Sequence, residues 1–320
     1  MYTKVILLIA VLCVVFPAIV QQEGPAHQPV SLSLIVTDKD GKGLNTIRKD
    51  QVRLFEDKAE QTILSIEADE RPVDYALLID ATGSFARLFA SALEAAKLFI
   101  INRRPQDQVA IVRFVNSGTI EAVQRFSGDG DALLKALDKL YVGKGQSALI
   151  DALYLSTQYV AEHNKSNDGR RKVVVVITDG EDRISYYKPE QLVKLLRETG
   201  VQVFAVGLIA NLDHDQRFHQ PTPRQRAVNF LTTVADESGG RLFLPETREE
   251  LSASAAQILL DLRAQFRIKY QSTNDASKKG FRKVEVRFVS TDGEKRNLIV
   301  PRRYYVGPKT PPGKNSEKKS

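Results

Sequence analysis

Five oxygen-bearing side chains stand where the chain leaves expected strands or enters an expected helix. They are Asp80, Thr82, Ser84, Ser147 and Asp179. The first three follow an apolar run that predicts a buried strand, and they place an oxygen on every second residue. In open α/β sheets the working site lies beyond the carboxyl ends of the strands, near the point where the strand order reverses. We therefore expect these side chains to meet at one edge of a sheet.

The chemistry of these side chains favours a hard cation. The loops that carry them, 80–84, 143–147 and 178–182, contain no histidine or cysteine, which argues against zinc or copper. Two carboxylates neutralise the formal charge of a dication without filling its coordination shell. Few carboxylates with small hydroxyls suit Mg²⁺, which keeps several waters, and Mn²⁺ or Ca²⁺ are the alternatives. An acidic group from outside would find such a metal ion incompletely coordinated.

The same residues admit other interpretations. Ser84 could cap the following helix, with Asp80 a solvated strand end. Asp80 could also be the nucleophile of a Mg²⁺-dependent phosphohydrolase, with Lys144 as the nearest lysine candidate. We expect no enzyme, because the sequence has no G-x-S-x-G, G-x-x-x-x-G-K-[ST] or H-E-x-x-H motif. Glu181 and Asp182 are interpreted as solvated loop charges.

The elements that must position these loops alternate between strand and helix. Apolar runs predict strands at 73–80, 107–115, 172–179, 201–208 and 241–245. Amphipathic patterns predict helices at 85–100, 131–140, 148–163, 189–200, 224–240 and 248–265. The unbroken apolar run at 172–179 is typical of a central parallel strand that is buried on both faces. This alternation predicts a doubly wound, mostly parallel α/β sheet of Rossmann-like type over residues 73–263.

Segments with a period of two flank the α/β unit. They lie at 31–38, 52–57 and 62–68 before it and at 266–272, 281–290 and 298–306 after it. Neither flanking segment, 29–70 or 266–306, has enough strands to bury a core comfortably. We therefore expect the two segments to form one small β-sandwich into which the α/β domain is inserted.

The N-terminal segment, residues 1–20, predicts export. A lysine-tipped start precedes an apolar run that Pro17 interrupts, which is the pattern of a cleaved secretory signal peptide. An uncleaved membrane anchor is the alternative, because no small residue stands just before the expected cleavage point. The chain's one cysteine, Cys13, lies in this run, so the mature chain has no disulfide. We expect a location in the periplasm, at the cell surface or outside the cell, with membrane contact only if the segment stays uncleaved.

The basic balance of the chain does not indicate a nucleic-acid partner. The formal charge is +7 and the pI is about 9.3. Part of this excess lies in the last segment, 307–320, where four lysines and one glutamate predict a disordered tail. No expected helix carries the dense Lys/Arg stripe that a nucleic-acid-binding surface needs.

The loop motifs resemble those of the von Willebrand factor type A (VWA) family. DATGS, the hydroxyl of Ser147 and ITDGED are similar to the three parts of that family's metal-ion-dependent adhesion site. The family usually has serine where Thr82 stands and threonine where Ser147 stands, and both replacements keep the hydroxyl. The resemblance implies that Thr82, Ser84 and Ser147 bind the cation directly. It implies that Asp80 and Asp179 act directly or through water.

The resemblance covers about residues 73–263. The flanking sequences VTDKDGKGL, FEDKAEQ and FRIKYQS are also similar to those of exported bacterial VWA-related proteins. The resemblance implies a non-catalytic, adhesion-type protein that presents a divalent cation to an Asp or Glu of a partner protein. A structural or assembly module whose metal stabilises the fold is the alternative. Integrin-type proteins, which carry a VWA domain inserted in a β-sandwich, support the insertion by analogy.

Two other features could contact a partner. The loop at 211–225 contains His214 and His219, and we interpret it as a polar loop near the rim of the site rather than as a second metal site. Tyr186 and Tyr187 follow the third loop. They are either exposed partner contacts or cover for the edge of the sheet.

Overall fold

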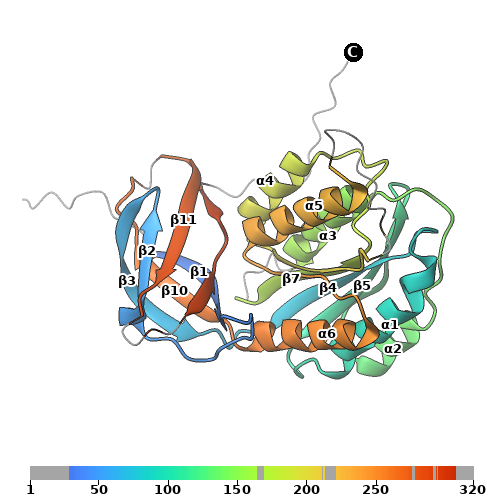
Figure 1. Cartoon of the computed structure of the whole chain (residues 1–320), viewed down its shortest axis with the longest axis horizontal. Helices are drawn as coiled ribbons and strands as arrows, with labels where there is room; N and C mark the ends of the chain where they lie inside the picture. The colour runs from blue at the N-terminus through green and yellow to red at the C-terminus, as the bar shows by residue number, and fades with distance from the viewer. Residues whose placement is uncertain are drawn as a thin grey trace, which may run out of the picture.

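The computed structural model describes residues 29–163, 169–210, 212, 221–275, 278–290, 293 and 295–307. In these residues an α/β unit lies beside an antiparallel β unit, and the long helix α6 runs along the base of the α/β unit toward the β unit (Figure 1). The predicted signal peptide and residues 308–320 of the predicted tail lie outside the described residues. Among the helices in the described ranges, none is long and apolar enough to cross a membrane.

The α/β unit is built on a six-stranded sheet with the order β6-β5-β4-β7-β8-β9. Its strands are β4 (Val73–Asp80), β5 (Gln108–Asn116), β6 (Thr119–Ser127), β7 (Arg171–Thr178), β8 (Gln202–Gly207) and β9 (Leu242–Phe243). All pairings are parallel except that of β5 with β6. Every residue of β4 is buried, as expected for a strand covered on both faces. The predicted doubly wound, mostly parallel sheet is confirmed.

Helices cover both faces of this sheet (Figure 1). One face carries α1 (Ala86–Ile101), α2 (Gly130–Leu137) and α6 (Arg248–Arg263), and the other carries α3 (Leu149–His163), α4 (Pro189–Thr199) and α5 (Pro223–Ser238). Each face has its own buried apolar cluster. Two separate cores therefore hold the sheet in place and fix where its loops emerge.

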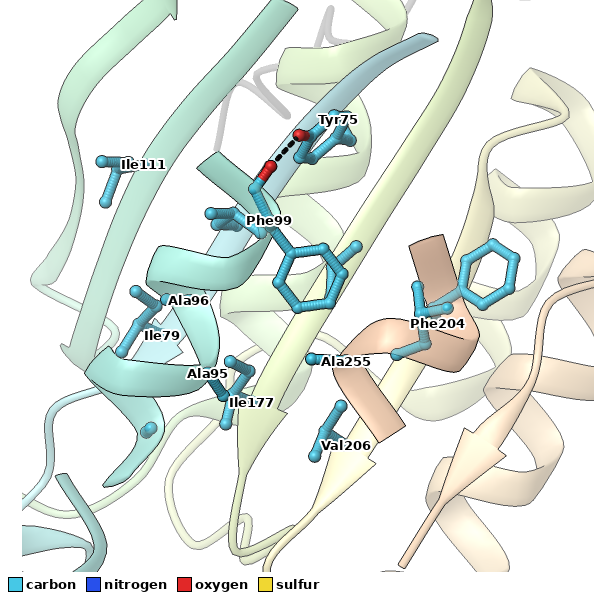
Figure 2. Close-up of a cluster of buried hydrophobic side chains, with 14 of the residues drawn as sticks. Tyr75, Ile79, Ala95, Ala96, Phe99, Ile111, Ile177, Phe204, Val206 and Ala255 are labelled. Carbon is cyan, nitrogen blue, oxygen red and sulfur yellow. Dashed lines mark hydrogen bonds between the residues drawn. The ribbon is translucent and has the colours of Figure 1, made fainter. Parts of the chain in front are cut away.

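The core between the sheet and helices α1 and α6 shows how closely they pack. Figure 2 shows Ala95 and Ala96 of α1 and Ala255 of α6 facing the β-branched side chains of the strands. Small residues at these positions let the helices approach the sheet. The hydroxyl of Tyr75 donates a hydrogen bond of 2.7 Å to the carbonyl of Phe99 (Figure 2). The one polar atom of this fully buried ring is thereby satisfied.

The strand order reverses at β4, which lies between β5 and β7. In the register of this region, Ile79 pairs with Ile177 and Asp80 pairs with Phe114. The loops after β4 and β7 therefore leave the sheet side by side at its carboxyl edge. This is the edge at which the sequence predicts the site.

The two flanking segments pair with each other, but the predicted β-sandwich is not confirmed. They form one seven-stranded, curled, antiparallel sheet with the order β12-β1-β10-β3-β2-β11-β13. Its strands are β1 (Pro29–Asp38), β2 (Val52–Glu56), β3 (Ala59–Ala68), β10 (Phe266–Gln271), β11 (Gly280–Phe288), β12 (Arg296–Ile299) and β13 (Arg303–Val306), with the 3₁₀ turn η1 (Lys49–Gln51) before β2. The curl brings β12 near β11, so one sheet folds around its own apolar cluster.

A divided strand and a strand that was not predicted are the main differences from the sequence predictions. The stretch 298–306 forms two strands, because Pro301 has no N–H to continue a ladder, and its halves pair with different partners, β1 and β11. Strand β6 was not predicted. It is an antiparallel edge strand with no buried residue, so its sequence lacks the buried apolar run that revealed the central strands.

Candidate metal centre

Asp80 ends strand β4 and is completely buried. Its Oδ1 atom accepts hydrogen bonds from the backbone N–H of Thr82 at 3.0 Å and from the Thr82 hydroxyl at 2.7 Å. Its Oδ2 atom accepts one from the hydroxyl of Thr178 at 2.7 Å. The carboxylate thus joins the loop after β4 to the end of β7.

Ser84 belongs to this cluster and does not cap the following helix. The position before α1 is occupied by Phe85, and no side chain accepts a hydrogen bond from the first turn. The Ser84 hydroxyl lies 3.1 Å from the hydroxyl of Thr82. It also donates a hydrogen bond of 3.1 Å to Oδ2 of Asp179. The helix-capping interpretation of Ser84 is therefore wrong.

Asp179 is held in a tight turn after β7. Its Oδ1 atom accepts a hydrogen bond from the backbone N–H of Glu181 at 3.0 Å. Gly180 between them has a φ of +78°, and a Cβ atom there would lie 2.8 Å from the Cβ of Ala227. Left-handed backbone and the close approach of α5 both require glycine at this position. The turn therefore leaves Oδ2 of Asp179 facing Ser84.

The loop that carries Ser147 is bound to both other loops. The N–H of Gly143 donates to the carbonyl of Ala81 at 2.8 Å, and the N–H groups of Arg183 and Ile184 donate to the carbonyl of Ser147 at 2.9 and 3.2 Å. Ser147 is buried, yet its hydroxyl has no hydrogen-bond partner among the described residues. An unsatisfied buried hydroxyl costs about 1–3 kcal/mol. A ligand at this position would remove that cost.

Burial and charge both act on the two carboxylates. Burial, followed by the nearby charge of Asp179, raises the pKa of Asp80 to about 7. Burial is also the main cause that raises the pKa of Asp179. Neither carboxylate forms an ion pair with a Lys or Arg of the described ranges. A bound dication would favour the ionised forms of both groups.

The donor set fits a hard cation with an open coordination shell. Nowhere in the described part of the chain do three or more His, Cys, Asp and Glu residues form a group that could hold a metal. The two aspartates and the hydroxyls of Thr82, Ser84 and Ser147 are all oxygen donors, which suit Mg²⁺, Mn²⁺ or Ca²⁺. The hydroxyl of Ser147 has no hydrogen-bond partner in the described structure, so its oxygen is available to a ligand.

Three residues that support this cluster were not predicted. Thr178 donates to Asp80 and accepts from the N–H of Gly180 at 3.0 Å. Asp182, interpreted as a solvated loop charge, is exposed, and its Oδ1 atom also accepts hydrogen bonds from the backbone N–H of Ile150 in α3 and from the hydroxyl of Ser185. Glu181, also interpreted as a solvated loop charge, has a side chain that is only 19% exposed and that pairs with the half-exposed Arg183.

The third residue, Asp151, links the Ser147 loop to the loop after Asp179. It is only 3% exposed, in the first turn of α3. Its carboxylate accepts the backbone N–H groups of Tyr186 and Tyr187 at 3.0 and 2.8 Å. An acidic residue in the first turn of a helix that follows a Gly/Ser loop was the available sequence signal. Its partners, 35 and 36 residues away, could not be read from the sequence.

The family model of the von Willebrand factor type A domain matches residues 74–251. The chain therefore belongs to the VWA family, and the family predicted from the loop motifs is confirmed.

Several known proteins are similar to this chain. It is 22% identical over 187 residues to an uncharacterised protein of Borreliella burgdorferi. The match covers 53% of each chain, so the chain spans about half the length of this curated relative.

Three solved structures are also similar. An aerotolerance-related membrane protein of Bacteroides fragilis is 18% identical with a TM-score of 0.46, and the match covers 59% of this chain and 98% of that one. Proximal thread matrix protein 1 from the mussel byssus, with a zinc-occupied MIDAS motif, is 19% identical with a TM-score of 0.47 and coverages of 63% and 48%. The manganese-loaded TRAP protein of Plasmodium vivax is 12% identical with a TM-score of 0.45 and coverages of 77% and 96%.

The remaining sequence candidates have different outcomes. His214 and His219 lie outside the described residues. Tyr186 and Tyr187 differ in their surroundings. The ring of Tyr187 packs on the apolar core under α3 and stacks on Tyr154, with 3.7 Å between ring centroids. Tyr186 is 79% exposed.

Proposed function

We propose that this chain is a non-catalytic binding protein whose VWA domain presents a divalent cation to an Asp or Glu of a partner protein. Thr82, Ser84 and Ser147 would bind the cation through their hydroxyl oxygens, and Asp80 and Asp179 would act directly or through water. The bound ion would supply an open coordination position for an incoming carboxylate. Mg²⁺ is the proposed ion, with Mn²⁺ and Ca²⁺ as alternatives.

The observation that carries this proposal is the unsatisfied hydroxyl of Ser147, on a loop that is hydrogen-bonded to both loops that follow the buried carboxylates of Asp80 and Asp179. Buried polar atoms are normally paired. Here one donor and two charges lack the partner that a cation would provide. Because the five side chains supply at most one oxygen each, the shell of a six-coordinate ion keeps at least one open position.

A phosphohydrolase that uses Asp80 as its nucleophile fits the geometry less well. Asp80 is completely buried, and both of its oxygens accept hydrogen bonds from Thr82 and Thr178. A nucleophile needs an oxygen free to attack and a nearby acid or base. Lys144, the lysine considered for that role, is exposed and has no ion pair or hydrogen bond within the described ranges.

We further propose that the protein is exported, with residues 1–20 as a signal peptide, and that it works in the periplasm, at the cell surface or outside the cell. The proposed domain division is a first β segment at 29–70, the VWA domain at 73–263, a second β segment at 266–306 and a basic tail at 307–320. The pairing of β1 with β10 and β12 supports the insertion of the VWA domain between two halves of one unit. A nucleic-acid partner is not proposed.

Exchange of a carboxylate at bound Mn²⁺ tests the function without a known partner. Residues 21–320 are loaded with Mn²⁺, and water proton relaxation is measured while acetate is added at constant ionic strength, with chloride as the control salt. An open site predicts a high relaxivity that acetate lowers by displacing metal-bound water, and no Mn²⁺ signal in Asp80→Ala. Bound Mn²⁺ whose relaxivity is low and unchanged by acetate would favour the structural module with a closed, fold-stabilising metal.

A further inference from the structure

Exposed apolar side chains gather on the two loops that carry Ser147 and Asp179. Tyr186 is 79% exposed, Tyr141 64% and Ile184 42%. Tyr141 precedes Ser147 in one loop, and the other two follow Asp179. Exposed apolar patches mark interaction surfaces, and tyrosine is enriched among the residues that dominate binding energy. We call these three side chains the apolar rim.

Hydrogen bonds attach the apolar rim to the candidate metal centre. The N–H of Ile184 donates to the carbonyl of Ser147, and its own carbonyl accepts from the hydroxyl of Ser117 at 3.4 Å. The carbonyl of Tyr141 accepts from the guanidinium of Arg113 at 2.9 Å. Two residues after Tyr141, Gly143 bonds to the loop after β4. A molecule seated at the cation would therefore lie within reach of the rim.

Both tyrosines of the rim are held before any partner arrives. The buried carboxylate of Asp151 fixes the backbone at Tyr186. The ring of Tyr186 meets the ring of Tyr187 edge-on, at 5.5 Å between centroids. The ring of Tyr141 lies 4.1 Å from the guanidinium carbon of Arg113, which pairs with Glu121. Rigid aromatic anchors lose little conformational entropy on binding.

The charge of this face complements an acidic partner. Lys144 lies between Tyr141 and Ser147 in the sequence, is exposed, and forms no ion pair among the described residues. The half-exposed Arg183 beside Ile184 pairs with Glu181. A dication would neutralise the two aspartates of the site. The ammonium group of Lys144 would then remain as a free positive charge on a loop of the site and would attract a second carboxylate.

We propose that the apolar rim binds the residues that flank the metal-binding Asp or Glu of a partner protein. The partner is a peptide segment in which an acidic residue has apolar or aromatic neighbours, with a second acidic residue placed for Lys144. This inference rests on the proposed function, because the acidic residue is expected at the cation. It adds which partner sequences the site would prefer, because the metal alone does not distinguish one acidic residue from another.

Selection from a phage-displayed library of random 12-residue peptides tests the inference. Immobilised residues 21–320 are used with Mg²⁺, and only phage released by EDTA are recovered. Recovered peptides are expected to combine an acidic residue with apolar or aromatic neighbours. Their affinity is then measured for Tyr186→Ser and Tyr141→Ser, each of which should weaken binding by about tenfold or more. Both substituted side chains are exposed, so the fold is expected to persist.

Ile101→Ser is the matched control, because Ile101 is 63% exposed at the far end of α1. Its affinity for the peptides should equal that of the wild type. The cation affinity of all three variants should also be unchanged.

The possible failures are distinguishable. In one outcome, acidic peptides are released by EDTA and yet bind Tyr186→Ser and Tyr141→Ser as tightly as the wild type. That result would contradict the proposed binding role of the apolar rim and would leave the proposed metal-dependent function intact. Failure to recover any peptide that depends on the cation would contradict the proposed function itself. Wild-type protein that cosediments with phosphatidylglycerol vesicles through Tyr186, and selects no peptide, would assign the rim to a membrane surface and overturn the proposal.

Discussion

The hydroxyl of Ser84 donates a hydrogen bond of 3.1 Å to Oδ2 of Asp179, across 95 residues of sequence. This contact joins the carboxyl ends of β4 and β7, the two strands that meet where the strand order reverses. Helix α1 gains no side-chain cap from Ser84, so the position of the hydroxyl is explained by the cluster and not by the helix.

Replacement of Ser84 by alanine should weaken cation binding without harming the fold. The residue is exposed and supports no helix end, and the substitution removes the hydrogen bond to Asp179, so the metal-free protein should lose no more than about 0.5–1.5 kcal/mol of stability. Loss of one of few ligands should lower the Mg²⁺ or Mn²⁺ affinity by about tenfold or more, equivalent to at least 1.4 kcal/mol. Isothermal titration calorimetry measures the affinity. Ser254→Ala, on the exposed face of α6, should bind the cation as the wild type does, and an equal loss in both variants would count against the assignment.

Replacement of Ser147 by alanine should have opposite effects with and without metal. In the metal-free protein the substitution removes a buried hydroxyl that has no partner in the described structure, so stability should rise by roughly 1 kcal/mol. With saturating cation the wild type should be the more stable of the two. Urea unfolding in EDTA and in Mg²⁺ measures both effects.

Ser156→Ala is the control for this pair of measurements. Ser156 is a second buried serine, in α3, whose hydroxyl also lacks a partner in the described structure. Its replacement should stabilise the metal-free protein by a similar amount, and Mg²⁺ should stabilise this variant as much as it stabilises the wild type. A response to Mg²⁺ that survives in Ser147→Ala would remove Ser147 from the ligand set.

The stability of the metal-free protein should fall as the pH rises through about 7. Asp80 has a folded-state pKa of about 7, above its ordinary value, so the folded protein holds a proton that the unfolded chain releases. The resulting stabilisation is complete at low pH and is lost as the pH passes the folded-state pKa. Between the unfolded-state and folded-state pKa values of Asp80, each pH unit lowers the free energy of unfolding by roughly 1.4 kcal/mol. Unfolding in EDTA from pH 5.5 to 8.5 measures this effect.

Two comparisons check the pH prediction. Asp80→Asn cannot titrate at this position, so the slope of its stability against pH should be smaller than that of the wild type. Protons and cation compete for the same carboxylates, so Mg²⁺ should bind more weakly at pH 5.5 than at pH 8.5. A wild-type protein whose metal-free stability is flat over this range would contradict the burial of two unpaired carboxylates.

Removal of the Asp151 carboxylate should release the loop that carries the apolar rim. Asp151→Ala removes the acceptor of the N–H groups of Tyr186 and Tyr187, and a hydrogen bond to a charged group contributes about 1.5–3 kcal/mol. Native-state hydrogen exchange should show slow exchange of both amides in the wild type and fast exchange in the variant. Glu181→Ala, which removes the ion pair with Arg183 and keeps the Asp151 carboxylate, should leave both amides protected.

Much of the α/β unit could be predicted because its signals are local. The apolar runs of β4 and β7 and the glycine after α4 each lie within a short stretch of sequence, so each can be recognised without knowing the fold. The shape of the β unit could not be predicted in this way. The pairing of β1 with β10 joins Leu34 to Phe266, which are far apart in the sequence. A period-two pattern predicts which face of a strand is buried, but it does not predict which strands pair with it. The same patterns are compatible with a sandwich and with one curled sheet.

In the candidate site, too, only the residues with a local sequence signal could be predicted. Asp80, Thr82 and Ser84 are recognisable by their spacing after a buried strand, and all three join one hydrogen-bonded cluster with Asp179. The supporting roles of Asp151 and Asp182 could not be read from the sequence. Their carboxylates bind backbone N–H groups, and any residue type supplies such groups, so the sequence carries no trace of the partner.

Thermal unfolding tests the proposed metal site most directly. The unfolding midpoint of residues 21–320 is measured with EDTA and then with millimolar Mg²⁺, Mn²⁺ or Ca²⁺, and the same measurements are made on Asp80→Ala. Cation well above its dissociation constant should stabilise the wild type by about 1–3 kcal/mol, which raises the unfolding midpoint by a few degrees. The midpoint of Asp80→Ala should not respond. A wild-type midpoint that no cation raises, or an equal rise in the variant, would contradict a metal site built on Asp80.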